Sequence, residues 1–438
     1  MAITNKILVL SEQRKILNFA LNHPDFFIKK ISEFYPLTTF LIEKYKDKWE
    51  WGYSYRDMHG WISVNGLSSN TALPWSIELI EKYEDRWGWD GLSRNTILPW
   101  SIELIEKYED KWDEEWIALS MNTALPWSVE LIEKYKDWWD WYRLSENPAF
   151  PWSMDLIDKY KDRLKWDIFG LSSNAFLPWS LALIEKYKDR WDWGYLIEFG
   201  GLGLSGNKEI PWSIELIEKY KDKWDWSGLS RNKALPWTEE LIEKYENRWD
   251  WTGLSCNTSL PWSIELIKKN EDKWNWDGLS NNKALPWSKE LIEKYENKWD
   301  WSGLSYYTSL PWYIEFIEKY ENKWNWTGLS YNTLLPWSLE LIEKYENKWD
   351  WHEMSSNTAL PWSLELIEKY KDRWRWGYHG LSSNIALPWS EKLIEKHENR
   401  WDWSELFYNM SVYQKVFKPY LTDSFIEEVM KIIIESKK

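Results

Sequence analysis

The sequence predicts an all-α solenoid of about fourteen helix-pair repeats, each about 25 residues long, with a cap at each end. Three observations lead to this fold class. Pro-Trp pairs recur along most of the chain. The apolar residues after each pair are spaced as on one face of a helix. Extra residues enter the repeat at a single point, as loops on one face of a stack do. Such a period is typical of proteins in which each unit buries its apolar face only against its neighbours.

The repeat frame covers residues 36–403, so we expect a single repeat domain rather than the three domains that 438 residues would suggest. A degenerate first copy begins at Pro36, which brings the number of copies to fourteen. The other copies begin at Pro74, Pro99, Pro126, Pro151, Pro178, Pro211, Pro236, Pro261, Pro286, Pro311, Pro336, Pro361 and Pro388.

The first element of each copy is predicted to be an amphipathic helix. In the second copy, the apolar residues fall at steps of 4, 1, 3 and 4: Trp75, Leu79, Ile80, Tyr83 and Trp87. The sequence leaves two starts open, because Pro74 suits a first helical turn and Ser76 suits an N-cap. Glu78 is expected near the positive end of this helix and Lys82 four residues further, as an i,i+4 ion pair.

The second element, WGWDGLSRN, is predicted to be a brief helix, because Trp89 and Leu92 are three residues apart. Asn95 is expected to end it in a left-handed conformation. A 3₁₀ turn and a strand stay open as alternatives, although Asp, Gly and Asn are poor strand formers.

Five junctions carry extra residues, and in each of them the frame holds up to the first Trp of the WxW phrase and resumes at Leu-Ser-x-Asn. We expect loops there, between the two elements of the repeat. The insertions are Gly52–Gly66, Glu114 with Glu115, Ile168 with Phe169, Tyr195–Leu202, and Tyr378 with His379.

Residues 1–35 and 404–438 lose the repeat but keep amphipathic patterns. We expect helical caps that shield the exposed faces of the terminal repeats.

The phrase LSRNTILPWSIELIEKY and its copies resemble the leucine-rich repeat variant family of bacteria. They are still more similar to the tryptophan-rich tandem repeats encoded by giant viruses and some bacteria. The resemblance spans residues 36–409 and implies a superhelical stack of short helix pairs. It brings no catalytic residue and implies only an interaction role.

The 42 tryptophans admit two interpretations. Exposed indoles could stack on sugar rings, which would make the chain a carbohydrate-binding protein. Burial between neighbouring repeats is the interpretation we favour, because three indoles bury ~600 Å² per unit, or roughly 15 kcal/mol as an upper bound.

Two further sets of residues recur. Lys82 has a lysine counterpart in all fourteen copies and Glu81 an acidic one in thirteen, which predicts cross-repeat ion pairs. Asn95 has an asparagine counterpart in all copies but the one with Tyr307, which predicts a ladder of backbone-bonding amides.

Composition argues against several classes of function. The formal charge of −15 disfavours nucleic acid, and no apolar stretch approaches the ~20 residues of a membrane span. The single cysteine, Cys256, fits a reducing compartment, so a cytoplasmic location is predicted. The five histidines share no ligand spacing, and no nucleotide-binding or catalytic motif appears. We therefore predict no enzyme activity, no catalytic or metal-binding residue and no cofactor.

The predicted function is a repeat scaffold that binds a protein or peptide on an extended surface. The slot before the recurring Asn varies most between copies, so it either drifts neutrally or carries recognition. The candidate residues are those of this slot and beside it that are typical of interfaces: Arg231, Tyr306, Tyr307, Tyr313 and Tyr331. A purely structural spacer is the remaining alternative.

Overall fold

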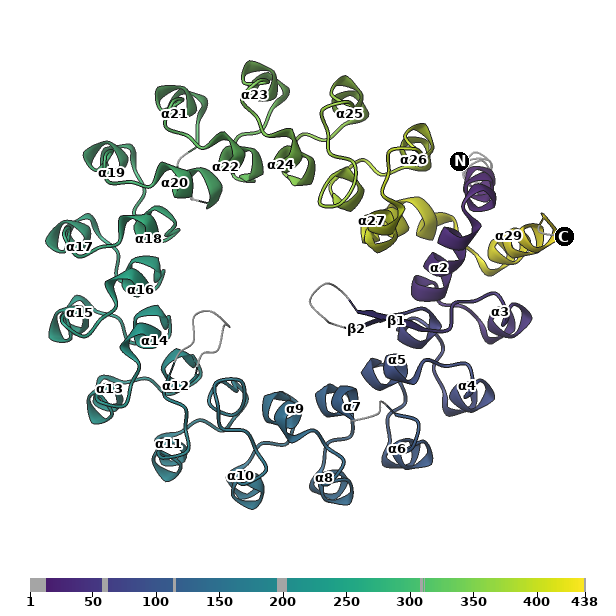
Figure 1. Ribbon diagram of the computed structural model, residues 1–438, viewed down its shortest axis with the longest axis horizontal. Coiled ribbons are helices and arrows are strands. Elements are labelled where there is room, and N and C mark those ends of the chain that lie inside the picture. Colours follow the sequence, from purple (N-terminus) through teal and green to yellow (C-terminus); the bar gives the residue numbers. More distant parts are fainter. Residues whose placement is uncertain are drawn as a thin grey trace, which may run out of the picture. The chain divides into compact units, whose positions relative to one another are not determined.

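The computed structural model is an all-α repeat solenoid, and it describes residues 13–56, 62–112, 116–194, 203–307, 310 and 312–436 (Figure 1). The chain divides into two compact units. The first comprises residues 1–113 and 330–438, and the second comprises residues 114–329. In both units each repeat contributes a first helix and a second element, which line up on opposite sides of the chain path (Figure 1).

The first helices are nearly identical in length and sequence. In the first unit they are α3 (Thr39–Lys44), α4 (Ile77–Lys82), α6 (Ile102–Lys107), α23 (Leu339–Lys344), α25 (Leu364–Lys369) and α26 (Glu391–Lys396). In the second unit they are α8 (Val129–Lys134), α10 (Met154–Tyr160), α11 (Leu181–Lys186), α13 (Ile214–Lys219), α15 (Glu239–Lys244), α17 (Ile264–Lys269), α19 (Lys289–Lys294) and α21 (Ile314–Lys319).

The second elements are more varied. In the first unit they are η1 (Leu67–Ser69), α5 (Trp89–Arg94), α24 (Trp351–Ser356), η2 (Leu381–Ser383) and α27 (Trp403–Tyr408). In the second unit they are α7 (Ile117–Met121), α9 (Trp141–Glu146), α12 (Gly203–Gly206), α14 (Trp226–Arg231), α16 (Trp251–Cys256), α18 (Trp276–Ser280) and α20 (Trp301–Tyr307). The next one, α22 (Trp326–Tyr331), spans the residue at which the two units divide.

The sequence left two starts open for the first helix, and the structure shows the one with Ser76 as the N-cap. The Ser76 hydroxyl accepts the Leu79 N–H at 3.2 Å. The helix is shorter than the apolar stripe predicted, because it ends at Lys82 and leaves Trp75 and Trp87 outside. The physical reason is a side-chain donor: the Trp87 indole N–H bonds the Ile80 carbonyl, which the next helical turn would otherwise use.

The second element is a short helix in most copies, and the exceptions coincide with insertions. It is a 3₁₀ turn in η1 and η2, and a run of hydrogen-bonded turns at residues 168–173. The left-handed conformation predicted for Asn95 is wrong. Its φ and ψ are −75° and 113°, and its side-chain oxygen accepts the Ile97 N–H at 3.0 Å, which closes the turn that follows.

The insertions differ in structure from one junction to the next. At the first insertion the structure shows two strands where a loop is predicted, because β1 (Tyr53–Arg56) pairs antiparallel with β2 (Ile62–Asn65). At the last insertion His379 has a φ of 51°. The insertions at residues 114–115 and 195–202 lie outside the described residues.

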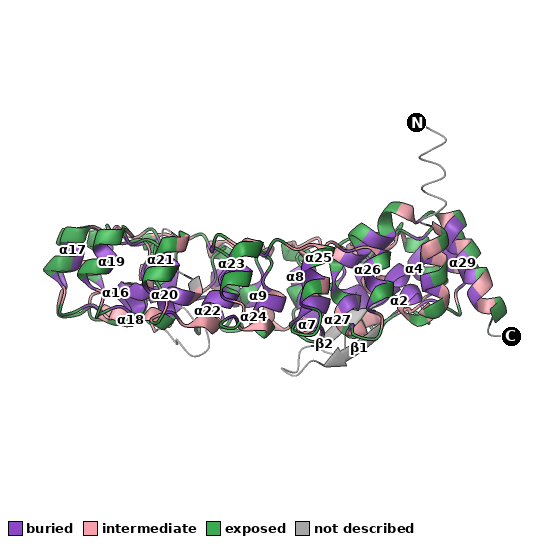
Figure 2. Ribbon diagram, turned by 90° about the horizontal axis from the view of Figure 1, so that it is seen from above, coloured by how far each residue is buried: buried purple, intermediate pink, exposed green. Residues whose placement is uncertain are grey.

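In each unit the core is an apolar layer between the two sets of helices, whose ribbons carry both buried and exposed residues (Figure 2). Leu79 and Ile80 of the first helix and Leu92 of the second are each at most 4% exposed. Outside the repeats lie α2 (Pro24–Phe34), α28 (Met410–Val412), η3 (Tyr413–Phe417), η4 (Lys418–Tyr420) and α29 (Asp423–Ser436).

Candidate functional site

The tryptophans join neighbouring repeats, as the sequence predicts, but in most copies only the middle one of the three is buried and the other two are half-buried. In the second unit Trp249 is 5% exposed. Its ring centroid lies 5.0 Å from that of Trp237 in the same repeat and 4.8 Å from that of Trp226 in the preceding one. All three indole N–H groups donate to backbone carbonyls, at 2.9 to 3.1 Å. The indole N–H groups are therefore satisfied by hydrogen bonds within the fold. The rings of Trp226 and Trp237 are half-buried.

The predicted ladder of asparagines is confirmed. The Asn257 amide donates to the carbonyl of Ser230 at 2.9 Å and to that of Asn232 at 3.3 Å, both in the preceding repeat. Its side-chain oxygen accepts the Ser259 N–H at 2.9 Å, and its carbonyl accepts the Trp262 indole N–H at 2.9 Å. Each ladder asparagine thus fixes its own turn and the register of two repeats at once.

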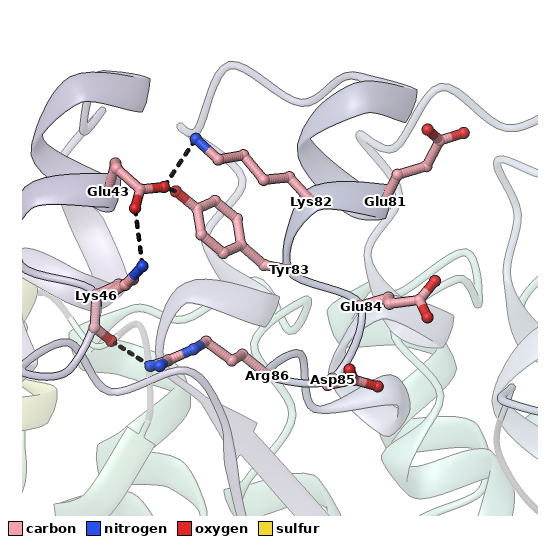
Figure 3. Close-up of a pocket in the computed structure, with 8 residues that line it drawn as sticks. All are labelled: Glu43, Lys46, Glu81, Lys82, Tyr83, Glu84, Asp85 and Arg86. Carbon is pink, nitrogen blue, oxygen red and sulfur yellow. Dashed lines mark hydrogen bonds and ion pairs between the residues drawn. The ribbon is translucent and has the colours of Figure 1, made fainter.

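The first helices present a charged surface whose groups are engaged in cross-repeat contacts. In the groove between α3 and α4, Glu43 accepts from Lys82 at 2.7 Å, Lys46 at 2.9 Å and the Tyr83 hydroxyl at 2.6 Å (Figure 3). The predicted Glu78–Lys82 pair is replaced by this contact with the preceding repeat. Arg86 completes the groove by donating to the Lys46 carbonyl at 2.9 Å.

The same groove recurs in the second unit, where Lys159 and Tyr160 both contact Glu133. The charges of this groove are already paired, and the same contacts recur between other neighbouring first helices. We therefore interpret the groove as a contact that stabilises the repeat array and not as a ligand pocket. The predicted cross-repeat ion pairs are confirmed along this surface, for example between Lys107 and Glu81 and between Lys319 and Glu293.

These contacts make the stability of the chain sensitive to acid. Lysine and tyrosine donors lower the pKa of Glu43, Glu185 and Glu218 from 4.5 to about 2. A carboxyl group whose pKa is lowered by folding contributes its full stabilisation above about pH 4.5 and loses it as the pH falls toward 2. We expect the urea midpoint of unfolding to fall between pH 5 and pH 2.5, and Glu185→Gln with Glu218→Gln to reduce that fall. Glu290→Gln is the control for removing a negative charge. An equal fall in the double variant would contradict the assignment.

The second helices present the face on which the repeats differ. In the second unit the residue before the ladder asparagine is exposed in α7, α9 and α16, where it is Met121, Glu146 and Cys256. The residue four positions earlier is also exposed in α16, α18 and α20: Thr252, Asp277 and Ser302. Residues four apart share a helix face. We call these two positions the variable row. Sequence reasoning missed the earlier position, although its i,i+4 spacing from the first was a usable signal.

The five candidate residues lie at different places. Arg231 and Tyr306 belong to the variable row of the second unit, whereas Tyr331, 38% exposed, belongs to that row in the first unit. Arg231 donates to Asp250 of the next repeat at 3.0 Å, so its guanidinium is already paired. Tyr313, 37% exposed, occupies the N-cap of α21, on the first-helix side. The side chain of Tyr307 lies outside the described residues.

The described part of the chain contains no cluster of three or more His, Cys, Asp or Glu side chains that could hold a metal ion. Among the helices described, none combines the length and the apolar character needed to cross a membrane. No protein-family model matches the chain, and neither does any curated protein or solved structure.

Proposed function

We propose that the chain is a non-enzymatic scaffold that binds a protein or peptide along the variable row of its second helices. The observation that carries this proposal is the contrast between the two faces of the repeat. First-helix charges recur and are paired across repeats, as at Glu43, Lys82 and Tyr83. The variable row differs from copy to copy, and its described residues are exposed in some copies and half-buried in most of the others. Positions fixed by packing recur in a stack, whereas positions outside the packing are free to carry recognition.

The half-buried tryptophans give weaker support to the alternative of carbohydrate binding. Sugar stacking requires a flat, open aromatic face. In a typical repeat the half-buried indoles pack against other aromatic rings instead, as Trp226 does against Tyr245 and Trp249. The family resemblance to tryptophan-rich tandem repeats likewise stays a prediction, and it favours an interaction role.

Selection of binders from a displayed peptide library with the intact chain would test the proposed function. We expect the selected peptides to lose at least about tenfold in affinity when Tyr306, which is half-buried, and Tyr331, which is exposed, are both replaced by Ser, because tyrosines often dominate an interface. The matched control replaces Ile264 and Leu339, which are 40% and 43% exposed on first helices, by Ser. Peptides that bind the tyrosine variant undiminished but lose affinity for the control would place recognition on the other face. A library that yields no binder would leave the structural spacer as the better explanation.

A further inference from the structure

The two ends of the chain meet in the first unit, and they do so through specific contacts. The Tyr413 hydroxyl donates to the carbonyl of Phe34 at 3.1 Å. The Tyr35 hydroxyl donates to the Asp423 carboxylate at 2.9 Å. The side-chain amide of Gln13 donates to the carbonyl of Tyr420 at 3.0 Å. These pairs join residues 379 to 407 positions apart in the sequence, so each end covers the other rather than a repeat face alone.

The C-terminal helix α29 takes the position of a first helix next to α3 (Figure 1). Lys44 of α3 pairs with Glu427 of α29, and the Tyr45 hydroxyl donates to the Glu427 carbonyl at 3.1 Å. At the following interface the equivalent residues, Lys82 and Tyr83, both contact Glu43. The first copy therefore uses against α29 the lysine and tyrosine that the second copy directs at the copy before it.

The N-terminal helix α2 takes the position of a second helix at the same interface. The Ser32 hydroxyl accepts the Glu50 N–H at 3.2 Å, and its carbonyl accepts the Asn70 amide at 2.9 Å. Ser68 does the same for the next copy: its hydroxyl accepts the Gly88 N–H at 2.9 Å and its carbonyl accepts the Asn95 amide at 3.1 Å. Ser32 thus supplies the first rung of the ladder.

The residues that lead into α2 meet the last repeat in a different way. Trp403 of α27 stacks on His23 with ring centroids 4.1 Å apart, and Phe19 lies 5.8 Å from the same indole. The imidazole Nε2 of His23 lies 3.1 Å from the Glu398 carboxylate. The position of the ladder serine is occupied by Phe407 in this last copy. Aromatic packing therefore takes over where the serine of the ladder is lost.

From these matches we propose that α2 and α29 form one composite repeat, assembled from both ends of the chain, which serves as a clasp for the repeat array. Neighbouring copies elsewhere are joined by a short loop, whereas α29 reaches α3 only through contacts. When two copies joined by a short loop separate, the loop keeps them close and favours their return. No such loop joins α29 to α3, so nothing keeps these two helices close once their contacts break. The composite repeat is therefore the place where the array opens first, and it opens at both ends together. This inference does not depend on the proposed function.

Hydrogen exchange on the full-length chain tests the clasp. Ile426 of α29 is fully buried, so Ile426→Ala creates a cavity in the composite repeat. We expect exchange to accelerate about tenfold or more in α2 and α3, nearly 400 residues away in sequence, as well as in α29. Ile217→Ala is the matched control, because Ile217 is equally buried in the ordinary first helix α13 and should affect only its own neighbourhood in the second unit. Acceleration confined to α29 would overturn the proposal.

A charge exchange provides an independent measurement that does not rely on a cavity. Glu427→Lys places two positive charges together at the clasp, and adding Lys44→Glu restores the pair in reversed order. We expect the single variant to accelerate exchange in α3 and the double variant to return it to the level of the unaltered chain. Equal acceleration in both variants would show that the contact does not hold the ends together.

Discussion

Replacing Asn282 by Ala is expected to destabilise the chain by about 2 to 4 kcal/mol, because several buried hydrogen bonds are lost together. The Asn282 amide donates to the carbonyls of Ser255 and Asn257 in the preceding repeat, at 2.8 and 3.3 Å. Its oxygen accepts the Ala284 N–H at 2.9 Å, and the residue is 1% exposed. The alanine side chain can replace neither donor nor acceptor, so polar backbone groups are left without partners inside the stack. Urea denaturation monitored by tryptophan fluorescence measures the effect.

The neighbouring residue is a close control for this variant. Asn281 is exposed, and its amide donates to the Asp277 carbonyl on the surface of the same repeat. We expect Asn281→Ala to change the free energy of unfolding by no more than about 0.5 kcal/mol. Similar losses for the two variants would mean that the ladder contributes nothing beyond local helix capping.

Replacing Trp249 by Ala is expected to cost about 3 to 5 kcal/mol, since the cavity opens between two repeats and cannot close without moving both. The lost ring contacts Trp226, Trp237 and Tyr245, and its N–H leaves the Ile242 carbonyl. Hydrogen exchange should also accelerate in α14, which belongs to the preceding repeat, because in a stack each unit is stabilised by its neighbour.

Trp138 offers a control among the tryptophans. It is 46% exposed and stands where other copies have a basic residue, such as Arg86 or Lys111. We expect Trp138→Lys to alter the free energy of unfolding by less than about 1 kcal/mol. If this variant lost as much stability as Trp249→Ala, indole content rather than burial between repeats would govern the effect.

Much of the fold was predictable because a repeated sequence repeats its own constraints. Three patterns each predicted a feature that the structure contains. The helical spacing that begins at Leu79 predicted the first helix, the recurrence of Asn95 predicted the asparagine ladder, and the recurring Glu81 and Lys82 predicted ion pairs between repeats. The candidate surface was only partly predictable. The variable slot marked a partly exposed face of the second helices, but only the structure shows that Arg231 is paired with Asp250 and that Tyr313 lies on the first-helix side.

The sequence by itself determined the period, the helical character of the units and the residues that bind one repeat to the next, because these depend on contacts between neighbours at fixed spacing. The tertiary structure alone decided where the first helix ends, since the Ile80 carbonyl is taken by an indole rather than by the next turn. It alone decided the partner of Lys82. It also decided that residues near the two ends of the chain contact each other, because the pair of Glu427 and Lys44 joins residues far apart in the sequence and no local pattern encodes it.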